Sequence, residues 1–179
     1  MLDAGKGKGF KKIALNEKPE SLEKDLEKLF DFSGKKPVNY IKNDADKQLY
    51  ELGKAAYSTY CAACHQPHGK GMKPLAPPLV DSEWVTGSEQ RLIALTMEGM
   101  QGPVTVNGVL YKVPDIQPVM PGLRASPDFS DEKIAAVLTY IRNTWDNRAP
   151  VVETKAVKEW RDTQSPRGPF TEAELKEIK

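Results

Sequence analysis

The feature that most constrains this chain is the segment YCAACHQPHGKG, residues 60–71, because it holds both cysteines and both histidines of the 179-residue sequence. Within it, CAACH at residues 61–65 matches the C-x-x-C-H pattern of covalent c-type haem attachment. Two thiols at this spacing can add to vinyl groups on adjacent pyrroles, and the next residue then lies beneath the iron. The sequence predicts one haem c, attached through Cys61 and Cys64, with His65 as the proximal ligand.

Three other interpretations of this motif are weaker. A thioredoxin-like pair would follow a strand and begin a helix, whereas CAACH follows a helical pattern. A closed zinc site needs four nitrogen or sulfur ligands, and the chain has no cysteine or histidine outside this segment to bring in a distant part of the fold. A disulfide across two intervening residues would close too small a loop to stabilise the fold much.

A haem that transfers electrons usually has a second axial ligand. His68 follows His65 too closely to reach the other face of the haem, so we expect it in a surface loop. The remaining candidates are the methionines: Met1, Met72, Met97, Met100 and Met120. Met120 ranks first, because the prolines of PVMPG, residues 118–122, stiffen its backbone and exclude a helix. Met100, beside a glycine turn, ranks second, and Met97 is expected to fill a helical core.

The rest of the chain alternates helical patterns with proline-rich loops. Helices are predicted, from apolar spacing and capping residues, at 19–32, 44–60, 88–99, 130–145 and a short stretch beginning at Thr171. The Asn107-Gly108 pair between apolar β-formers predicts a hairpin. Loops without regular structure are expected at 73–84 and 113–130, and a mostly extended segment at 146–169.

Charge and hydropathy exclude some partners. A formal net charge of +1 gives no reason to expect nucleic acid, and no stretch approaches the roughly 20 apolar residues of a membrane span. The N-terminus lacks the apolar run and cleavage site of a signal peptide, so we expect a removed signal or an excised domain. Glycine and lysine alternate over residues 5–9, which is typical of a flexible linker.

Several motifs together resemble a class I cytochrome c domain: the helix with Gly53 and Tyr57, CAACH, PPL at 77–79, MPG at 120–122 and IAAVLTYIR at 134–142. The chain is similar to haem domains and subunits of bacterial membrane-associated or periplasmic dehydrogenases, in which GPVTVNGVLY at 102–111 also has a counterpart. The likeness covers about residues 44–145 and, weakly, the tail up to PFTEAEL at 169–175. The first forty or so residues lie outside this likeness.

This resemblance implies an all-α, cytochrome c-like fold with a small β-hairpin insertion and N- and C-terminal extensions. The implied organisation is a flexible linker at 1–19, an N-terminal helical extension at 20–43, the haem domain at 44–145 and a C-terminal extension at 146–179 that packs on it. The first and last helices of such domains cross closely, and Gly53 facing Tyr140 looks like that contact.

The resemblance also implies further haem-binding residues. The carbonyl of Pro77 or Pro78 is similar to the one that accepts a hydrogen bond from the proximal histidine and so orients His65. Trp84 and Arg91 resemble residues near the haem propionates. Each also has a simpler interpretation, as a core aromatic and a solvated helix charge.

Histidine and methionine together leave no open coordination position, so no catalysis is expected at this haem. The sequence therefore predicts an electron-transfer protein or domain that accepts electrons from a dehydrogenase and passes them to a respiratory acceptor. The partner is a separate redox protein or a fused dehydrogenase domain. The alternative is a haem enzyme or gas sensor with an open distal site. Covalent haem attachment predicts a periplasmic or extracytoplasmic location.

Overall fold

The computed structural model describes residues 39–178. Its helical elements are α2 (Asp44–Ala56), η1 (Tyr57–Cys61), α3 (Ala62–His65), α4 (Glu83–Thr86), α5 (Glu89–Glu98), α6 (Asp131–Arg142), α7 (Thr154–Thr163) and α8 (Glu172–Glu177). Its strands are β1 (Gly99–Gln101), β2 (Val104–Val106), β3 (Val109–Tyr111) and β4 (Val119–Pro121). The predicted linker at 1–19 and helix at 19–32 lie outside the described residues.

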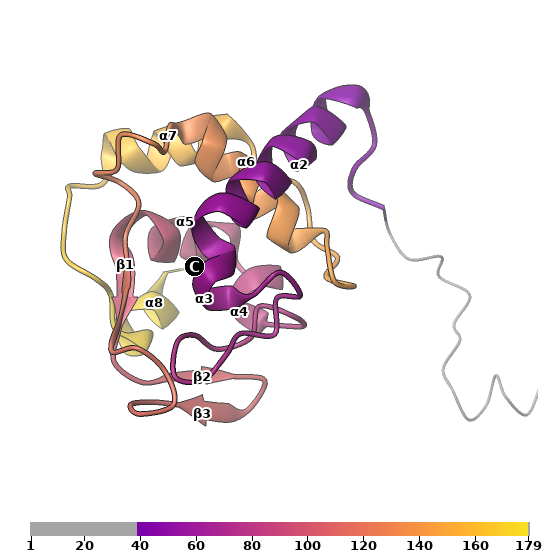
Figure 1. Ribbon diagram of the computed structural model, residues 1–179. Coiled ribbons are helices and arrows are strands. Elements are labelled where there is room, and N and C mark those ends of the chain that lie inside the picture. Colours follow the sequence, from indigo (N-terminus) through magenta and orange to yellow (C-terminus); the bar gives the residue numbers. More distant parts are fainter. Residues whose placement is uncertain (1–38, 179) are drawn as a thin grey trace, which may run out of the picture. The chain divides into compact units, whose positions relative to one another are not determined.

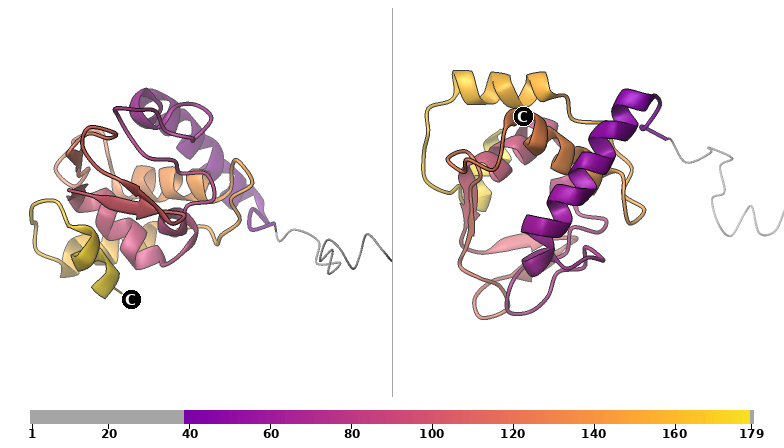
Figure 2. Two further views of the ribbon diagram at one scale, coloured as in Figure 1. Left: turned by 90° about the horizontal axis from the view of Figure 1, so that it is seen from below. Right: turned by 45° about the horizontal axis from the view of Figure 1, so that its top comes forward.

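Helices α2 and α6 cross in direct contact (Figures 1 and 2). Gly53 lies at the crossing, where a Cβ atom would collide with the carbonyl of Ala136 and come within 2.9 Å of the Cβ of Tyr140. The expected contact between Gly53 and Tyr140 is therefore confirmed. Both helices begin where they were predicted. Ser130 caps α6 as expected, and Asn43 caps α2, which was not predicted; each side chain accepts a hydrogen bond from a first-turn amide.

The cysteine segment continues α2 without a break. After Ala56 the helix widens into η1, a single π-helical stretch, and then tightens into α3, which ends at His65. The hydroxyl of Tyr57 donates a 2.7 Å hydrogen bond to the carbonyl of Gln66, which fixes the chain just after His65. Short π-helical stretches are frequent at functional sites, and this one carries Cys61 at its end.

Two antiparallel strand pairs follow α5. The hairpin predicted around Asn107 and Gly108 is present, with β2 paired to β3 and both turn residues at positive φ (51° and 75°). The second pair is a correction to the sequence analysis. Part of the loop predicted at 113–130 forms β4, which pairs with β1 so that Met100 lies opposite Met120.

The C-terminal region also differs from its prediction as mostly extended. Residues Thr154–Thr163 form α7, which packs on α5 and α6 and buries Val157 completely. Its sequence is strongly polar, so a propensity argument missed a helix whose stability comes from that packing. The short helix predicted at Thr171 is confirmed as α8, and Thr171 and Glu174 form its capping box.

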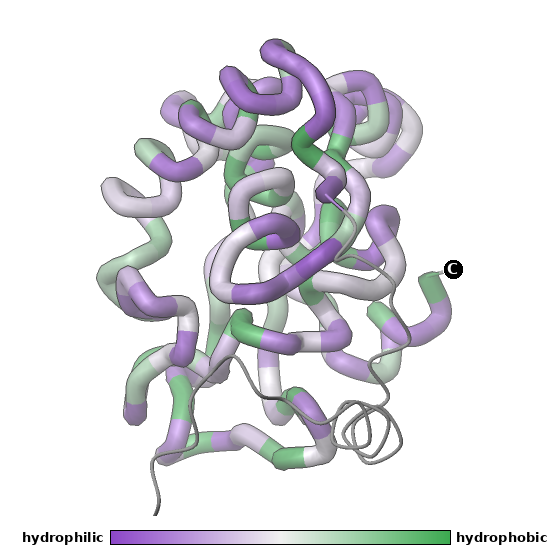
Figure 3. The backbone as a smooth tube through the Cα atoms, turned by 90° about the vertical axis from the view of Figure 1, so that its right-hand side faces the viewer, coloured by the Kyte–Doolittle hydropathy of each residue, from purple (hydrophilic) through white to green (hydrophobic). Residues whose placement is uncertain are grey.

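Hydrophobic and hydrophilic stretches alternate along the helices (Figure 3). The buried hydrophobic side chains of helices and strands form two clusters. One lies around α2 and α6 and includes Tyr57, Ile134 and Leu138. The other joins α5 to the strands and α8 and includes Trp84 and Met100. Among residues 39–178, no helix has the length and apolar composition needed to cross a membrane.

Asn147 ties the proline-rich loop to the end of α6. Its buried amide accepts a 2.8 Å hydrogen bond from the Asp81 amide and donates to the carbonyls of Leu79 (3.0 Å) and Ile141 (2.8 Å). Replacing Asn147 by Ala leaves these groups without partners, so we expect the free energy of unfolding in urea to fall by about 2–3 kcal/mol. The exposed neighbour variant Arg148→Ala should change it by less than about 0.5 kcal/mol. Equal stabilities of the two variants would contradict this role.

Candidate functional site

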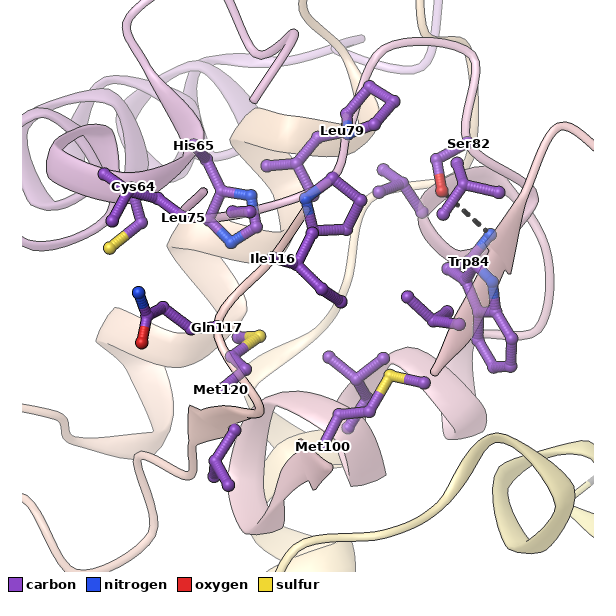
Figure 4. A pocket seen from close by; sticks show the side chains of 18 of the residues that line it. Cys64, His65, Leu75, Leu79, Ser82, Trp84, Met100, Ile116, Gln117 and Met120 are labelled. Atoms are coloured by element: carbon purple, nitrogen blue, oxygen red, sulfur yellow. Dashed lines mark hydrogen bonds between the residues drawn. The ribbon is translucent and has the colours of Figure 1, made fainter. Parts of the chain in front are cut away.

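An apolar cavity lies between α3, the proline-rich loop, α5 and the two strand pairs. Its empty space, open mouth included, amounts to about 850 Å³. Figure 4 shows the His65 ring and the Met120 thioether both directed into this cavity, from α3 and β4 respectively. The fold therefore brings together two predicted ligands that stand 55 positions apart in the sequence.

The two cysteines differ in their surroundings. Cys64 is exposed and lines the cavity, whereas Cys61 is partly buried against the α2 and α6 cluster. Burial, together with the nearby Cys64, raises the pKa of the Cys61 thiol to about 11. Neither thiol is in a disulfide, so both are available to form thioether bonds.

His65 is buried on one side of its ring and faces the cavity with the other. Burial lowers the pKa of His65, and the nearby carbonyl of Pro77 opposes this shift. Nδ1 of His65 is buried and has no hydrogen-bond partner of regular geometry. The contact with Pro77 is therefore not a regular hydrogen bond. Pro77 and Pro78 both line the cavity. Nδ1 has no other partner, so it is free to donate to this carbonyl, and a hydrogen bond of that kind orients the ring of an axial histidine.

The methionine candidates fall into those that line the cavity and those that do not. Met120 and Met100 both line the cavity, whereas Met72 is an exposed loop residue and Met97 is fully buried in the core. Met120 is only partly buried, while Met100 is 8% exposed and packs among the apolar side chains of the second cluster. His68 lies exposed in a turn, as expected, where its Nδ1 accepts a hydrogen bond from the amide of Lys70.

Trp84 and Arg91 occupy different places. Trp84 is buried in the cavity wall, and its indole Nε1 donates a 2.7 Å hydrogen bond to the carbonyl of Thr105. Arg91 does not line the cavity. Its guanidinium donates instead to the carbonyls of Leu175 and Ile178 at the end of α8, at 2.9 and 3.0 Å. The structure thus gives Arg91 a helix-capping contact at the end of α8, and its predicted place near a haem propionate stays a prediction.

The chemistry of these groups fits a covalently bound haem. Cys64 in the cavity wall and Cys61 three positions earlier offer thiols for two thioether bonds. His65 and Met120 offer an imidazole and a thioether for the iron, and the apolar walls suit the macrocycle. Residues 50–145 match the sequence model of the family described as Cytochrome c. The chain belongs to the cytochrome c family.

Known cytochromes support this assignment. The chain is 32% identical over 124 residues to Cytochrome c-552 of Thermus thermophilus, a match that covers 66% of this chain and 78% of the relative. It is 34% identical over 116 residues to the cytochrome c subunit of a quinone alcohol dehydrogenase from Gluconacetobacter polyoxogenes, covering 64% of this chain. It is 30% identical over 115 residues to the Fructose dehydrogenase cytochrome subunit of Gluconobacter japonicus, covering 61% of this chain.

The match spans only 23% and 22% of the lengths of these two dehydrogenase subunits. As a member of the family, this cytochrome carries a covalently bound haem c, and Cys61 and Cys64 have the spacing that its attachment requires.

Sequence reasoning missed part of the cavity wall of this cytochrome. Val104 and Val106 on β2, together with Ile116, line the cavity and are buried. The hairpin is therefore a structural wall of the site. The signal was present in the V-x-V alternation, which places both valines on one face of a strand, but the pattern does not say what that face covers.

Proposed function

We propose that this cytochrome is an electron carrier, free or fused to an oxidoreductase, whose haem iron is held by His65 and Met120. The supporting observation is that both side chains point into one apolar cavity beside the attachment cysteines (Figure 4). When bound, the haem supplies a one-electron couple between ferrous and ferric iron. The methionine ligand and the apolar walls favour the ferrous state and so a higher potential.

The protein's own residues hold the group and restrict access to it. In this proposal Cys61 and Cys64 carry the thioether bonds, and the carbonyl of Pro77 orients His65 through Nδ1. Pro78 and Trp84 form apolar wall, with the indole of Trp84 fixed by its bond to the hairpin. If His65 and Met120 both hold the iron, no coordination position would remain for a substrate, and the protein would exchange electrons only.

The names of the relatives support a dehydrogenase as the electron donor, since two of them are dehydrogenase cytochrome subunits. We propose that this cytochrome accepts electrons from such an enzyme, as a partner or a fused domain, and passes them to a respiratory acceptor outside the cytoplasmic membrane. The haem domain is assigned to residues 44–145. Residues 20–43 and 146–179 are proposed as its N- and C-terminal extensions.

The alternative, a haem enzyme or gas sensor, requires an open distal position. We expect the ferrous wild-type protein to keep its visible spectrum under carbon monoxide, because the Met120 thioether occupies the sixth position. The measurement is the absorption spectrum of dithionite-reduced protein before and after equilibration with the gas. A control protein unfolded in guanidinium should bind carbon monoxide and show that the gas is in excess. Rapid formation of a carbonyl complex by the folded protein would favour the sensor or enzyme and reject the carrier.

A further inference from the structure

The segment that leaves the cavity after Met120 runs along the end of α5. The amide of Leu123 donates a 3.0 Å hydrogen bond to the carbonyl of Thr96, and the amide of Arg124 donates a 2.9 Å bond to that of Met97. These carbonyls belong to the last turn of α5, where carbonyl groups have no amide partner within the helix itself. Leu123 and Arg124, the third and fourth residues after Met120, therefore cap the helix and tie this segment to it.

At the same place lies a buried ion pair between Glu98 and Arg124. The side chains are only 2% and 11% exposed. Nε of Arg124 donates a 2.6 Å hydrogen bond to Oε1 of Glu98, and Nη2 lies 2.5 Å from the same oxygen without being aligned for a second bond. A buried carboxylate is costly unless it is paired. Without Arg124, the buried carboxylate of Glu98 would lose its ion-pair partner.

Arg161 of α7 holds the other side of Arg124. Its Nη1 donates a 2.8 Å bond to the carbonyl of Arg124, and Nη1 of Arg124 donates a 3.1 Å bond to the carbonyl of Arg161. Nε of Arg161 pairs with Asp131 at 2.6 Å, at the start of α6. Two arginines and two carboxylates thus balance in charge, and they anchor the segment after β4 to α6 and α7.

This cluster closes one end of the strand pair that carries Met120. Glu98 directly precedes β1, and Arg124 follows β4 by three residues. The last paired positions at this end are Gly99 and Pro121, next to the pair of Met100 and Met120. The ion pair therefore joins the chain entering β1 to the chain leaving β4, beyond the last paired positions of the two strands.

We propose that Arg124 is a positioning residue for the Met120 ligand, and that its buried pair with Glu98 holds β4 so that the thioether stays on the iron. The inference rests on the proposed function, since it requires Met120 to be a ligand. A thioether is a weak donor, so its occupancy of the iron depends on how firmly its strand is held. Residues behind a ligand commonly contribute in this way to the strength of the metal bond.

The test is competition for the iron in the haem-loaded ferric protein. Imidazole added to the solution displaces a loosely held thioether. The apparent dissociation constant of imidazole therefore reports how firmly Met120 is positioned. We expect Arg124→Met to lower that constant by about tenfold or more. Arg124→Lys keeps the charge but loses the planar fork and the bond to Arg161, and we expect a smaller decrease of about threefold.

Arg142 provides a matched control. It is also buried, at 3% exposed, and it donates to the carbonyls of Pro150 and Val85 at 2.9 and 3.2 Å, away from β4. Arg142→Met should lower the Tm but leave imidazole affinity within twofold of wild type. If both Arg124 variants match wild type, or if Arg142→Met changes the affinity as much as Arg124→Met does, the proposal is overturned. Where Arg124→Met does not take up haem, Arg124→Lys decides.

The variant Met120→Leu separates this inference from the proposed function. If its ferric spectrum keeps the sulfur-to-iron charge-transfer band, Met120 is not the ligand and both proposals fail. If the band is lost in Met120→Leu while the Arg124 variants bind imidazole as wild type does, only the positioning role fails.

Discussion

Replacing Met120 by Leu is expected to abolish the sulfur-to-iron charge-transfer band of the ferric protein. Leucine has nearly the same volume but no donor atom, so the fold should tolerate it while the iron loses its sixth ligand. The ferrous variant should then bind carbon monoxide. Its reduction potential should fall by more than about 100 mV, within the roughly 0.8 V range over which axial ligands set haem potentials. Visible spectra and a redox titration measure both effects.

Met100 provides the matched control, because it lies directly opposite Met120 in the strand pair and lines the same cavity. It is the second candidate ligand. Met100→Leu should keep the charge-transfer band and should shift the potential little. If the two variants exchanged these behaviours, the iron would be held by Met100 and our assignment of Met120 would be wrong.

Replacing Gly53 by Ala is expected to destabilise the protein strongly, although it adds only one methyl group. The new Cβ would overlap the backbone carbonyl of Ala136, and backbone cannot move aside without separating α2 from α6. Overpacking of this kind costs about 3 kcal/mol, whereas the better helix propensity of alanine returns only about 1 kcal/mol. The clash therefore dominates, and we expect the Tm to fall by several degrees.

Gly168 is the control for this experiment. A Cβ atom there would meet no other atom within 4 Å, and its backbone is in a conformation open to other residues. Gly168→Ala should therefore leave the Tm almost unchanged, as measured by circular dichroism on haem-loaded protein. A Gly53→Ala variant as stable as Gly168→Ala would show that the two helices do not cross as closely as described.

Local chemistry accounts for what could be predicted from sequence. The helix starts at Ser88, Ser130 and Thr171 were predicted because a cap is a contact between residues three positions apart. The hairpin at Asn107 and Gly108 was predicted because its turn requires positive φ at both residues. The attachment motif is local in the same sense, so the cofactor could be inferred before any fold was known.

Long-range contacts account for what the prediction missed. The polar sequence of α7 is helical because Val157 is buried against distant helices. Strand β4 exists because β1, about twenty residues earlier, pairs with it. The guanidinium of Arg91 donates to a carbonyl at the end of α8, more than eighty positions away, and this contact was not predicted. None of these partners is visible from neighbouring positions.

The amino-acid sequence by itself determined which cofactor this protein carries and where it is attached, because thioether formation depends on the spacing of a few adjacent residues. Only the tertiary structure decided which residues share the cavity with His65, which side chains form its walls and how the Met120 strand is held. Those properties depend on the burial of side chains from α5, α7 and the strands against one another, and burial is a property of the assembled chain.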